Sequence, residues 1–356
     1  MLDSTEYGRA NGLLAIHESQ QGFSPRWIEY CDENDIPYKL VDCHANDIIR
    51  QLEPCCALLW HYSQSDPRDL LIARQILSAL EHAQFKLFPD FRTAWHFDDK
   101  VGQKYLFEAL DVPTVGTYVF VDRSAALDWA ATTDYPKVFK SRHGAGSSNV
   151  QLVEDAAQAK RLISRAFRHG FTVYRPWDNL KERFYKWRQG DSGALDLLKG
   201  LARFIHPPRF SRVLGREIGY VYFQDFAADN DSDVRVVVIG ERAFGIRRWT
   251  RPDDFRASGS GRVSYDPADI DLECVELALQ ISRKIGSSCI AFDFVRQADD
   301  NLAVIEISYG FIASGYDECP GYWDSDLNWH EGPFSPQGWI VEFCLDRQQE
   351  SPRSGE

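Results

Sequence analysis

The chain has 356 residues, of which 44% are hydrophobic, and a formal net charge of −13 at pH 7. This is the composition of an ordinary globular protein, and no stretch approaches the roughly 20 apolar residues of a membrane helix or the order of a signal peptide, so we expect a cytoplasmic protein without membrane insertion. The negative charge also argues against nucleic acid as the main partner, because a phosphate-binding surface needs a basic face.

Short apolar runs alternate with helical patterns over the first third of the chain. The apolar runs are "GLLAIHES", "PYKLVD", "CALLWHY" and "KLFPD", and the helical patterns cover residues 25–34, 45–52 and 67–82. This alternation is typical of βαβ units, which build a parallel sheet with helices on both faces. We therefore predict an α/β domain over residues 1–117, which includes a helix over 98–110.

The region over residues 118–216 is predicted to be a smaller α+β lobe. The strands "GTYVFVD" and "YPKVFKS" flank a helix over 124–133, and a glycine-rich loop then leads to the strand "NVQLVED". A helical and basic stretch follows, with nine lysine or arginine residues against three acidic residues between Lys181 and Arg216. Its cations could select an acidic or sugar-containing partner; alternatively, they form the solvated face of an amphipathic helix.

The region over residues 217–346 is predicted to be a second α+β lobe. The runs "IGYVYFQDFA", "SDVRVVVIG" and "ERAFGIRRWT" favour antiparallel strands, and a helix over 269–285 leads to the hairpin "CIAFDFVRQADDNLAVIEIS". The aromatic and acidic segment 316–334 could line an acceptor pocket, or its tryptophans could fill the core. The tail 347–356 is predicted to be disordered. The eight cysteines show no CxxC pair and no zinc spacing, which indicates reduced and mostly buried thiols.

The best-defined chemistry lies in the last hairpin. If its turn is symmetric about Asp299 and Asp300, Asp293 lies directly opposite Glu306 on one face of the sheet. Two facing carboxylates repel each other, so a positive group is expected between them. Mg²⁺ carrying substrate phosphates is the cation that fits best, and Ser308 on the same face could add a hydroxyl ligand. Alternatively, one carboxylate points to solvent or pairs with an arginine.

The preceding hairpin, with its turn at "GE", supplies arginines. Its register places Asp233 and Arg235 on one face, with Arg248 opposite Asp233 and Arg247 on the other side. Arg235 is therefore a candidate for an anion contact, while Arg247 and Arg248 compete for a second contact, because a one-residue slip exchanges them. A surface ion pair with Asp233 is the alternative for Arg248.

The glycine-rich loop in "KVFKSRHGAGSSNV" joins two strands. Gly144 and Gly146 allow backbone N–H groups to approach an oxyanion without obstruction, and Lys140 at the end of the first strand could reach phosphate oxygens. We therefore expect the loop to close over ATP phosphates, with His143 either as a further contact or as a solvated side chain. The chain has neither a Walker A motif nor a G-x-G-x-x-G fingerprint. An ordinary mobile β-turn is the alternative.

These parts follow one another in a recognisable order. A βαβ lobe is followed by a helix bearing Lys100, a strand lysine with a Gly/Ser loop, the stretch "YFQDFAADNDSDVRVVVIG", an arginine strand and the acidic hairpin. Over residues 85–345 this order resembles the ATP-grasp superfamily, in particular its carboxylate–amine ligases such as glutathione synthetase. The resemblance implies an α/β (α+β) ATP-grasp fold, in which two α+β lobes grip the nucleotide beside a Rossmann-like pre-ATP-grasp domain. The runs "EISYGF" and "CPGYW" also resemble ATP-grasp proteins of bacterial surface-polysaccharide clusters.

The resemblance implies that two lysines and the closing loop hold the phosphates of ATP. These residues are Lys100, Lys140, Gly144, Gly146, Ser147 and Ser148. The hinge, which holds adenine through main-chain groups in the superfamily, matches Gln224, Asp225, Phe226 and Ala227. The resemblance also implies that the acidic side chain of Asp225, within the hinge, takes the ribose.

The resemblance also implies a metal site and an arginine pair. Asp293 and Glu306 match the residues that bind Mg²⁺, and Arg235 matches the arginine of a D-x-R pattern. Arg248 matches the arginine on the phosphate side. The superfamily usually ends its metal motif as E-x-N, whereas here Ser308 stands at the last position, so the third ligand is a serine hydroxyl or water.

The implied activity is that of an ATP-dependent ligase, which joins a carboxylate to an amine through an acyl phosphate and releases ADP and phosphate. Both substrates are then small molecules, derived from sugars or amino acids. Two alternatives stay open, a phosphotransferase on the same fold and a non-catalytic nucleotide-binding protein. A homodimer is also open, since many members of the superfamily are dimers.

Overall fold

The computed structural model describes residues 12–345 apart from 145–149, 175–176, 178–179, 181–182, 185–186, 188–198, 201–202, 204–207, 229, 252–254, 256 and 258–260. The predictions for Gly146, Ser147, Ser148, much of the basic stretch and the tail 347–356 therefore lie outside the described residues. Across the described residues, no helix combines the length and apolar character that crossing a bilayer demands. All eight cysteines are free and all but Cys56 are buried, as predicted.

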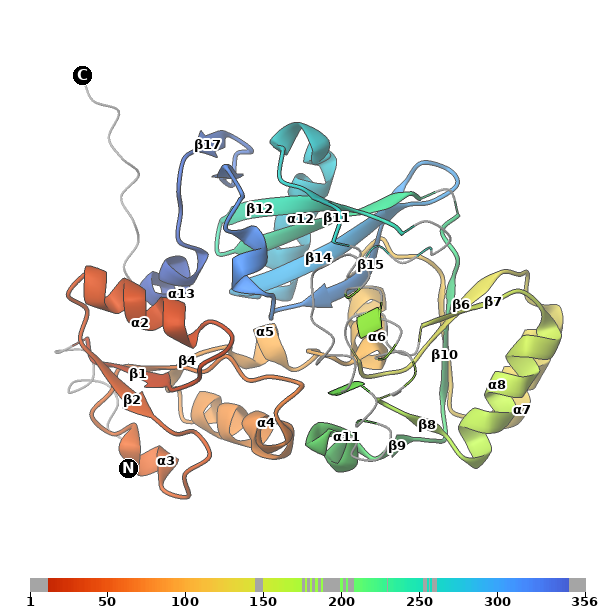
Figure 1. Cartoon of the computed structure of the whole chain (residues 1–356), viewed down its shortest axis with the longest axis horizontal. Coiled ribbons are helices and arrows are strands. Elements are labelled where there is room, and N and C mark those ends of the chain that lie inside the picture. The colour runs from red at the N-terminus through yellow and green to blue at the C-terminus, as the bar shows by residue number, and fades with distance from the viewer. Residues whose placement is uncertain are drawn as a thin grey trace.

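Four parallel strands form the N-terminal sheet. In spatial order they are β2 (Tyr38–Val41), β1 (Leu14–His17), β3 (Ala57–Leu59) and β4 (Lys86–Phe88). The connecting helices are α2 (Ser24–Glu33), α3 (Ile48–Gln51) and α4 (Pro67–His82). The central strands β1 and β3 are buried throughout, because α2 packs on one face and α3 and α4 pack on the other (Figure 1). The predicted βαβ arrangement is confirmed.

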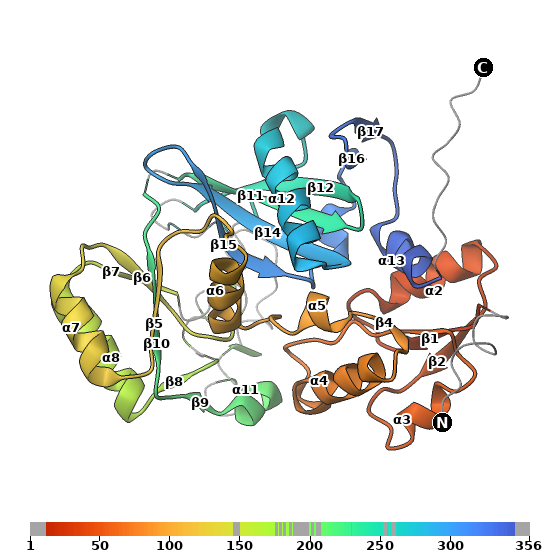
Figure 2. The ribbon, with the colours of Figure 1, turned by 180° about the vertical axis from the view of Figure 1, so that it is seen from behind.

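The second sheet joins strands that are far apart in the sequence. Its antiparallel order is β5 (Thr117–Phe120), β10 (Val221–Asp225), β6 (Lys137–Lys140) and β7 (Gln151–Val153). Helices α7 (Arg123–Thr132) and α8 (Ala156–Arg168) lie side by side on its outer face (Figures 1 and 2). We expected β10 to open the third region's sheet, but it lies between β5 and β6. The reason is burial, since Val221 and Phe223 pack into the core under α7 and α8.

The third sheet is antiparallel and carries the acidic hairpin. Its order is β15 (Leu302–Ser308), β14 (Cys289–Arg296), β11 (Ser232–Ile239), β12 (Arg242–Trp249), β16 (Gly321–Trp323) and β17 (Trp329–Glu331), with β13 (Val263–Ser264) also paired to β12. The 3-10 turn η1 (Pro267–Asp269) leads to helix α12 (Leu272–Ile285), which covers one face. Trp323 is buried against Trp329, so part of the segment 316–334 fills the core.

The first and third regions share one hydrophobic core. Phe23 and Trp27 at α2 cluster with Val237 and Phe244 of the third sheet and with Trp339 of α13 (Pro336–Cys344). Helix α13 lies beside α2, although the two helices come from opposite ends of the described chain (Figure 1). The smaller elements are α5 (Phe91–Ala94), α11 (Arg209–Leu214), η2 (Ala313–Tyr316), β8 (Phe171–Thr172) and β9 (Arg216–Glu217).

Helix α6 (Lys100–Ala109) lies between the second sheet and the acidic hairpin (Figure 2). The side chain of Asp99 caps it by accepting a hydrogen bond from the Gly102 N–H (2.9 Å). Gln103 is buried and donates to the carbonyl groups of His96 (3.1 Å) and Ile307 (2.9 Å), while its own oxygen accepts from the Ile307 N–H (3.3 Å). Because β15 is an edge strand, Gln103 satisfies backbone groups that have no neighbouring strand.

Replacing Gln103 by leucine should lower the free energy of unfolding by about 1–3 kcal/mol, because the buried backbone groups of Ile307 lose their partners. Urea unfolding followed by tryptophan fluorescence measures this change. The matched control is Gln280→Leu on α12, where the side chain is exposed, and it should change stability by less than about 0.5 kcal/mol. Equal effects of the two substitutions would contradict the role of Gln103.

Candidate active site

A cavity of about 1800 Å³ lies between the N-terminal sheet and the two antiparallel sheets. Its walls come from α6, β6, β10, β11, β12, β14 and β15 and from the loops that follow β1, β2 and β3. The predicted site residues that line it are Lys100, Lys140, Gly144, Gln224, Asp225, Phe226, Ala227, Arg235, Arg248, Asp293, Glu306 and Ser308. Of the segment 316–334, Tyr316 lines the cavity.

Asp293 and Glu306 face each other across β14 and β15, as predicted. The register next to the turn differs by one residue from the assumed one, since Arg296 pairs with Leu302 instead of Ala303. A β-bulge at Ile305 absorbs this difference and restores the predicted pairing. The sequence analysis thus predicted the right pair from a register that is wrong by one residue beside the turn.

Arg235 and Arg248 surround Asp293. Arg235 pairs directly with Asp293 across β11 and β14, and its Nε lies 3.4 Å from Asp293 Oδ1. Arg248 donates two hydrogen bonds to Asp233 (2.7 and 2.8 Å), and its Nη2 lies 3.0 Å from Asp293 Oδ1. Burial alone would raise the pKa of Asp293, but the two guanidinium groups hold it below its usual value. Arg248 therefore pairs with Asp233 in the interior, not at the surface as in the alternative, and also reaches Asp293.

Arg247 lies outside this cavity. Its Nε donates to the carbonyl oxygen of Asp269 (2.6 Å), and its Nη1 donates to the hydroxyl of Ser232 (3.1 Å). Since Asp233 pairs with Arg248 in the ladder, the predicted register is correct and no slip exchanges the two arginines. The second anion contact at this site can therefore come from Arg248 and not from Arg247.

Lys100 neutralises the other carboxylate. Its Nζ lies 3.0 Å from Glu306 Oε1 and donates to the carbonyl oxygen of Gly144 (3.0 Å). Burial would lower the pKa of Lys100, but the carboxylates of Glu306 and Asp98 raise it above its usual value. The positive charge expected beside the facing carboxylates is thus present, with Lys100 at Glu306 and two arginines at Asp293.

Lys140, the last residue of β6, is a buried cation of a different kind. Lys140 is 8% exposed. Burial lowers the pKa of its ammonium group to about 8, although the carboxylate of Glu306 acts to raise it. Among the described residues, no side chain forms an ion pair or hydrogen bond with its Nζ. A buried ammonium group in this state is stabilised by an anionic ligand, so Lys140 is suited to contact phosphate oxygens.

The glycine-rich loop starts from a stem that is tied to the first turn of α6. Gly144 has a φ of 120°, and its N–H donates to Asp98 Oδ1 (2.8 Å). Arg142 forms an ion pair with Asp99, with Nε 2.8 Å from Oδ1, and its carbonyl oxygen accepts from the Lys100 N–H (3.1 Å). The sequence analysis did not predict Asp98 or Asp99. The acidic pair in "FDDK", directly before Lys100, is the signal that could have indicated them.

Glu217 holds the same stem from the other side. Its carboxylate accepts hydrogen bonds from the backbone N–H groups of Arg142 (3.0 Å) and His143 (2.9 Å). The Nδ1 atom of His143 lies 2.8 Å from Glu217 Oε1, so this ring is held by a buried carboxylate rather than solvated. Glu217 is 74 residues from His143 and 75 residues from Arg142 in the sequence, and no local pattern could have predicted it.

The hinge leads out of β10 along the cavity wall. Gln224 is buried and donates to Thr117 Oγ1 (3.2 Å) and to the hydroxyl of Tyr222 (3.3 Å). Asp225 forms an ion pair with Lys137, which faces it across β10 and β6. A ribose hydroxyl at this position would therefore share the Asp225 carboxylate with Lys137, which the sequence analysis did not predict.

The acid pair has the character of a magnesium site. Oδ1 of Asp293 is buried and lies 3.0 Å from Arg248 Nη2 and 3.4 Å from Arg235 Nε. The Glu306 side chain is 34% exposed and lines the cavity. Facing carboxylate oxygens are the ligands that hard divalent cations prefer. Ser308 donates its hydroxyl proton to the Gly310 carbonyl (2.8 Å), which leaves its oxygen lone pairs for a cation.

Comparison with known protein sequences identifies relatives of this chain. Residues 213–314 match the family described as "RimK-like ATP-grasp domain". Over 230 residues, or 64% of the chain, the sequence is 22% identical to the alpha-aminoadipate–LysW ligase LysX of Saccharolobus solfataricus, and the match covers 67% of that protein.

Solved structures share the fold. The RimK-domain ATP-grasp protein of Sphaerobacter thermophilus is 16% identical with a TM-score of 0.53, over 94% of this chain and 99% of that chain. The biotin carboxylase domain of Hydrogenobacter thermophilus 2-oxoglutarate carboxylase, solved with MgADP and bicarbonate, is 12% identical with a TM-score of 0.59, over 96% and 71%. The predicted ATP-grasp fold is confirmed, whereas the narrower resemblance to polysaccharide-cluster proteins stays a prediction.

Replacing Lys140 by methionine should raise the free energy of unfolding of the nucleotide-free protein at pH 7 by about 1–3 kcal/mol, because one unit of pKa shift corresponds to about 1.4 kcal/mol. A folded-state pKa near 8, against 10.5 in the unfolded chain, means that the parent protein gains stability as pH rises between these values. The advantage of Lys140→Met is therefore full below pH 8 and shrinks towards pH 10.

Urea unfolding at pH 7, 8, 9 and 9.5 measures this advantage. The control is Lys160→Met on α8, where the lysine is exposed, and its effect should be small at every pH. A Lys140→Met protein that is less stable than the parent at pH 7 would show that the ammonium group is well solvated or paired.

Proposed function

We propose that this chain, which has the ATP-grasp fold, is an ATP-dependent ligase, which joins a carboxylate to an amine and releases ADP and phosphate. The observation that carries this proposal is the cross-strand row of Glu306, Asp293 and Arg235 in one cavity wall, with Lys100 and Lys140 beside it. Buried charges of both signs in a large cavity are expected where a protein binds and transfers a phosphoryl group.

Lys100 and Lys140 are the proposed contacts to the phosphates of ATP. The loop that begins at Gly144 would cover these phosphates, because its stem is tied to the helix that carries Lys100. The hinge residues 224–227 would hold adenine through main-chain groups and the ribose through Asp225. Gly146, Ser147 and Ser148 stay predicted loop contacts.

Asp293 and Glu306 are the proposed ligands of Mg²⁺, with Ser308 as a third oxygen. When bound, the ion neutralises charge on the phosphoryl group that is transferred. Lys100 and Arg235, which balance the two carboxylates in the free protein, then supply positive charge to the phosphates and to the carboxylate substrate. This is electrostatic stabilisation by groups that are already in place.

The proposed reaction has two steps. A carboxylate oxygen of the first substrate attacks the γ-phosphorus of ATP, and the bond from that phosphorus to the ADP oxygen breaks, which gives an acyl phosphate and ADP. An amine nitrogen then attacks the acyl carbon, the carbon–oxygen bond to phosphate breaks, and the proton of the amine leaves to solvent. Arg235 and Arg248 orient the anionic groups in both steps, and no protein nucleophile is required.

The size of the cavity supports two substrates. Its volume of about 1800 Å³ exceeds the roughly 300–1,000 Å³ of an ordinary small-molecule site, so a nucleotide and an acceptor can lie in it together. We propose small carboxylate and amine substrates derived from amino acids or sugars. We also propose that the domains of the chain divide at residues 117 and 216. The same proposal includes a cytoplasmic location, because the reaction needs a supply of ATP, and a homodimer.

A screen of amino acids, sugar acids and nucleotide-linked sugars for stimulated ADP release, with mass spectrometry of the products, tests the proposed ligation. We expect ADP release to require a carboxylate and an amine together and the product mass to show loss of water between them. A phosphorylated product formed without any amine would identify a phosphotransferase instead.

Replacing Glu306 by glutamine should lower ADP release at least about 100-fold, because a carboxylate ligand of the metal is lost while the shape of the side chain is kept. The control is Glu276→Gln on α12, an exposed position outside the cavity, which should keep full activity. A Glu306→Gln protein that binds and turns over ATP like its parent would favour a non-catalytic nucleotide-binding protein.

A further inference from the structure

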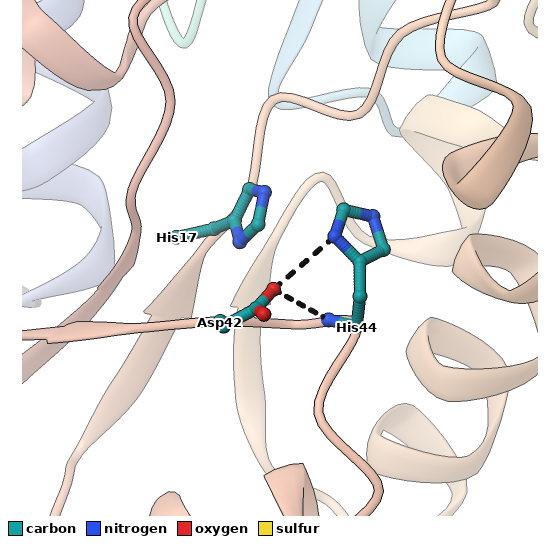
Figure 3. Close-up of side chains that lie close together, drawn as sticks. All are labelled: His17, Asp42 and His44. Carbon is teal, nitrogen blue, oxygen red and sulfur yellow. Dashed lines mark hydrogen bonds and ion pairs between the residues drawn. The ribbon is translucent and has the colours of Figure 1, made fainter.

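Two histidines and an aspartate lie at the carboxyl edge of the N-terminal sheet, in the cavity wall. His17 ends β1, Asp42 directly follows β2, and His44 comes two residues later. Figure 3 shows the two imidazole rings around the Asp42 carboxylate. One ligand atom from each of the three residues lies within 4.8 Å of the others. The proposed ligation uses none of these groups, although open α/β sheets bind ligands at this edge.

His44 has one nitrogen with a partner and one without. Its Nε2 lies 2.7 Å from Oδ1 of Asp69, a carboxylate whose other oxygen accepts the Ser63 N–H (2.7 Å). A neutral ring that donates from Nε2 keeps its lone pair on Nδ1. The His44 side chain is 8% exposed, and among the described residues its Nδ1 has no hydrogen-bond partner, although Oδ1 of Asp42 lies 3.1 Å away.

In the tautomer that donates from Nε2, two electron pairs lie against each other. The lone pair of His44 Nδ1 faces an oxygen of Asp42 that already accepts the His44 backbone N–H (2.9 Å). Two ligands of one zinc ion, with bonds of about 2.0–2.2 Å, lie roughly 3.3 Å apart, close to the observed separation. A carboxylate on the second ring nitrogen, here Asp69, is also the usual support of a zinc-bound histidine.

His17 completes the group. Its ring lies edge-on to that of His44, with the ring centres 5.0 Å apart. The His17 side chain is buried, with 8% of the residue exposed, so its ring is fixed beside that of His44. Its Nδ1 accepts the Cys43 N–H (3.1 Å), and a bound ion has to displace this contact or the Nε2 proton. His17 is therefore the weakest ligand of the three.

We propose that His17, Asp42 and His44 bind a zinc-class transition-metal ion in the wall of the cavity. Imidazole with one carboxylate is a donor set that suits zinc rather than Mg²⁺. A second possible metal-binding group, His44 with Asp66 and Asp69, is less suitable. Asp66 caps α4 and holds Arg68, and Asp69 is already bound to His44. Three protein ligands leave a coordination position for an oxygen or nitrogen of a molecule in the cavity.

The test is titration of the full-length protein with Zn²⁺ in excess Mg²⁺, in competition with a chromophoric chelator. We expect one Zn²⁺ ion to bind per chain, and this binding should require the three side chains. Co²⁺ bound in place of Zn²⁺ should give the visible absorption that is typical of a four-coordinate site. His44→Gln should abolish this binding, Asp42→Asn and Asp69→Asn should weaken it about 10–100-fold, and His17→Gln should weaken it less than His44→Gln.

The controls separate this proposal from the proposed ligation. Glu306→Gln removes a proposed Mg²⁺ ligand and should leave zinc binding unchanged, as should His82→Asn at an exposed histidine. Asp42 has a side chain that is 63% exposed, so its asparagine variant should fold, which circular dichroism verifies. Absence of zinc binding, or binding that His44→Gln and Asp42→Asn leave unchanged, would overturn the proposal.

Discussion

The opposition of Asp293 and Glu306 across one pair of strands is the constraint on which the site depends. Two carboxylates in this position repel each other, and burial strengthens that repulsion because the local dielectric is low. The folded chain therefore brings cations to them from several elements: Arg235 from the adjacent strand, Arg248 from the strand beyond and Lys100 from α6. The acid pair thus determines which elements have to meet at the cavity, even before a ligand is bound.

Helix α6 connects the acidic hairpin to the stem of the glycine-rich loop. Its first turn contacts the stem of the glycine-rich loop, and Gln103 one turn later fixes it to the edge of the acidic hairpin. Lys100 touches both sides, since its ammonium group contacts Glu306 and the Gly144 carbonyl. An anion that draws Lys100 away from Glu306 would therefore act on the loop at the same time. The proposed nucleotide site and the stem of the glycine-rich loop are in this way connected through Lys100.

Sequence reasoning was most successful where a short periodicity decides the geometry. The alternation of β11 and β12 placed Arg248 opposite Asp233, as the structure has it, although a slip that exchanges Arg247 and Arg248 was left open. The facing of Asp293 and Glu306 followed from hairpin symmetry even though a bulge had to restore the register. It failed where partners are distant in the sequence: the pairing of β10 depends on burial under α7 and α8, and Glu217 reaches the loop stem from another part of the chain. The cluster at His17, Asp42 and His44 was missed for the same reason, since only the parallel sheet brings the ends of β1 and β2 together.

The position of β10 has a consequence for how the protein is made. β5 and β6 do not pair with each other, because the strand between them is encoded about 80 residues after β6. As the chain emerges from the ribosome, α7 and α8 are thus synthesised before the sheet on which they pack can be completed. Their apolar faces stay without a full partner until residue 225 has left the exit tunnel. The second lobe can then assemble only as a late unit, after the N-terminal strands are already available for pairing.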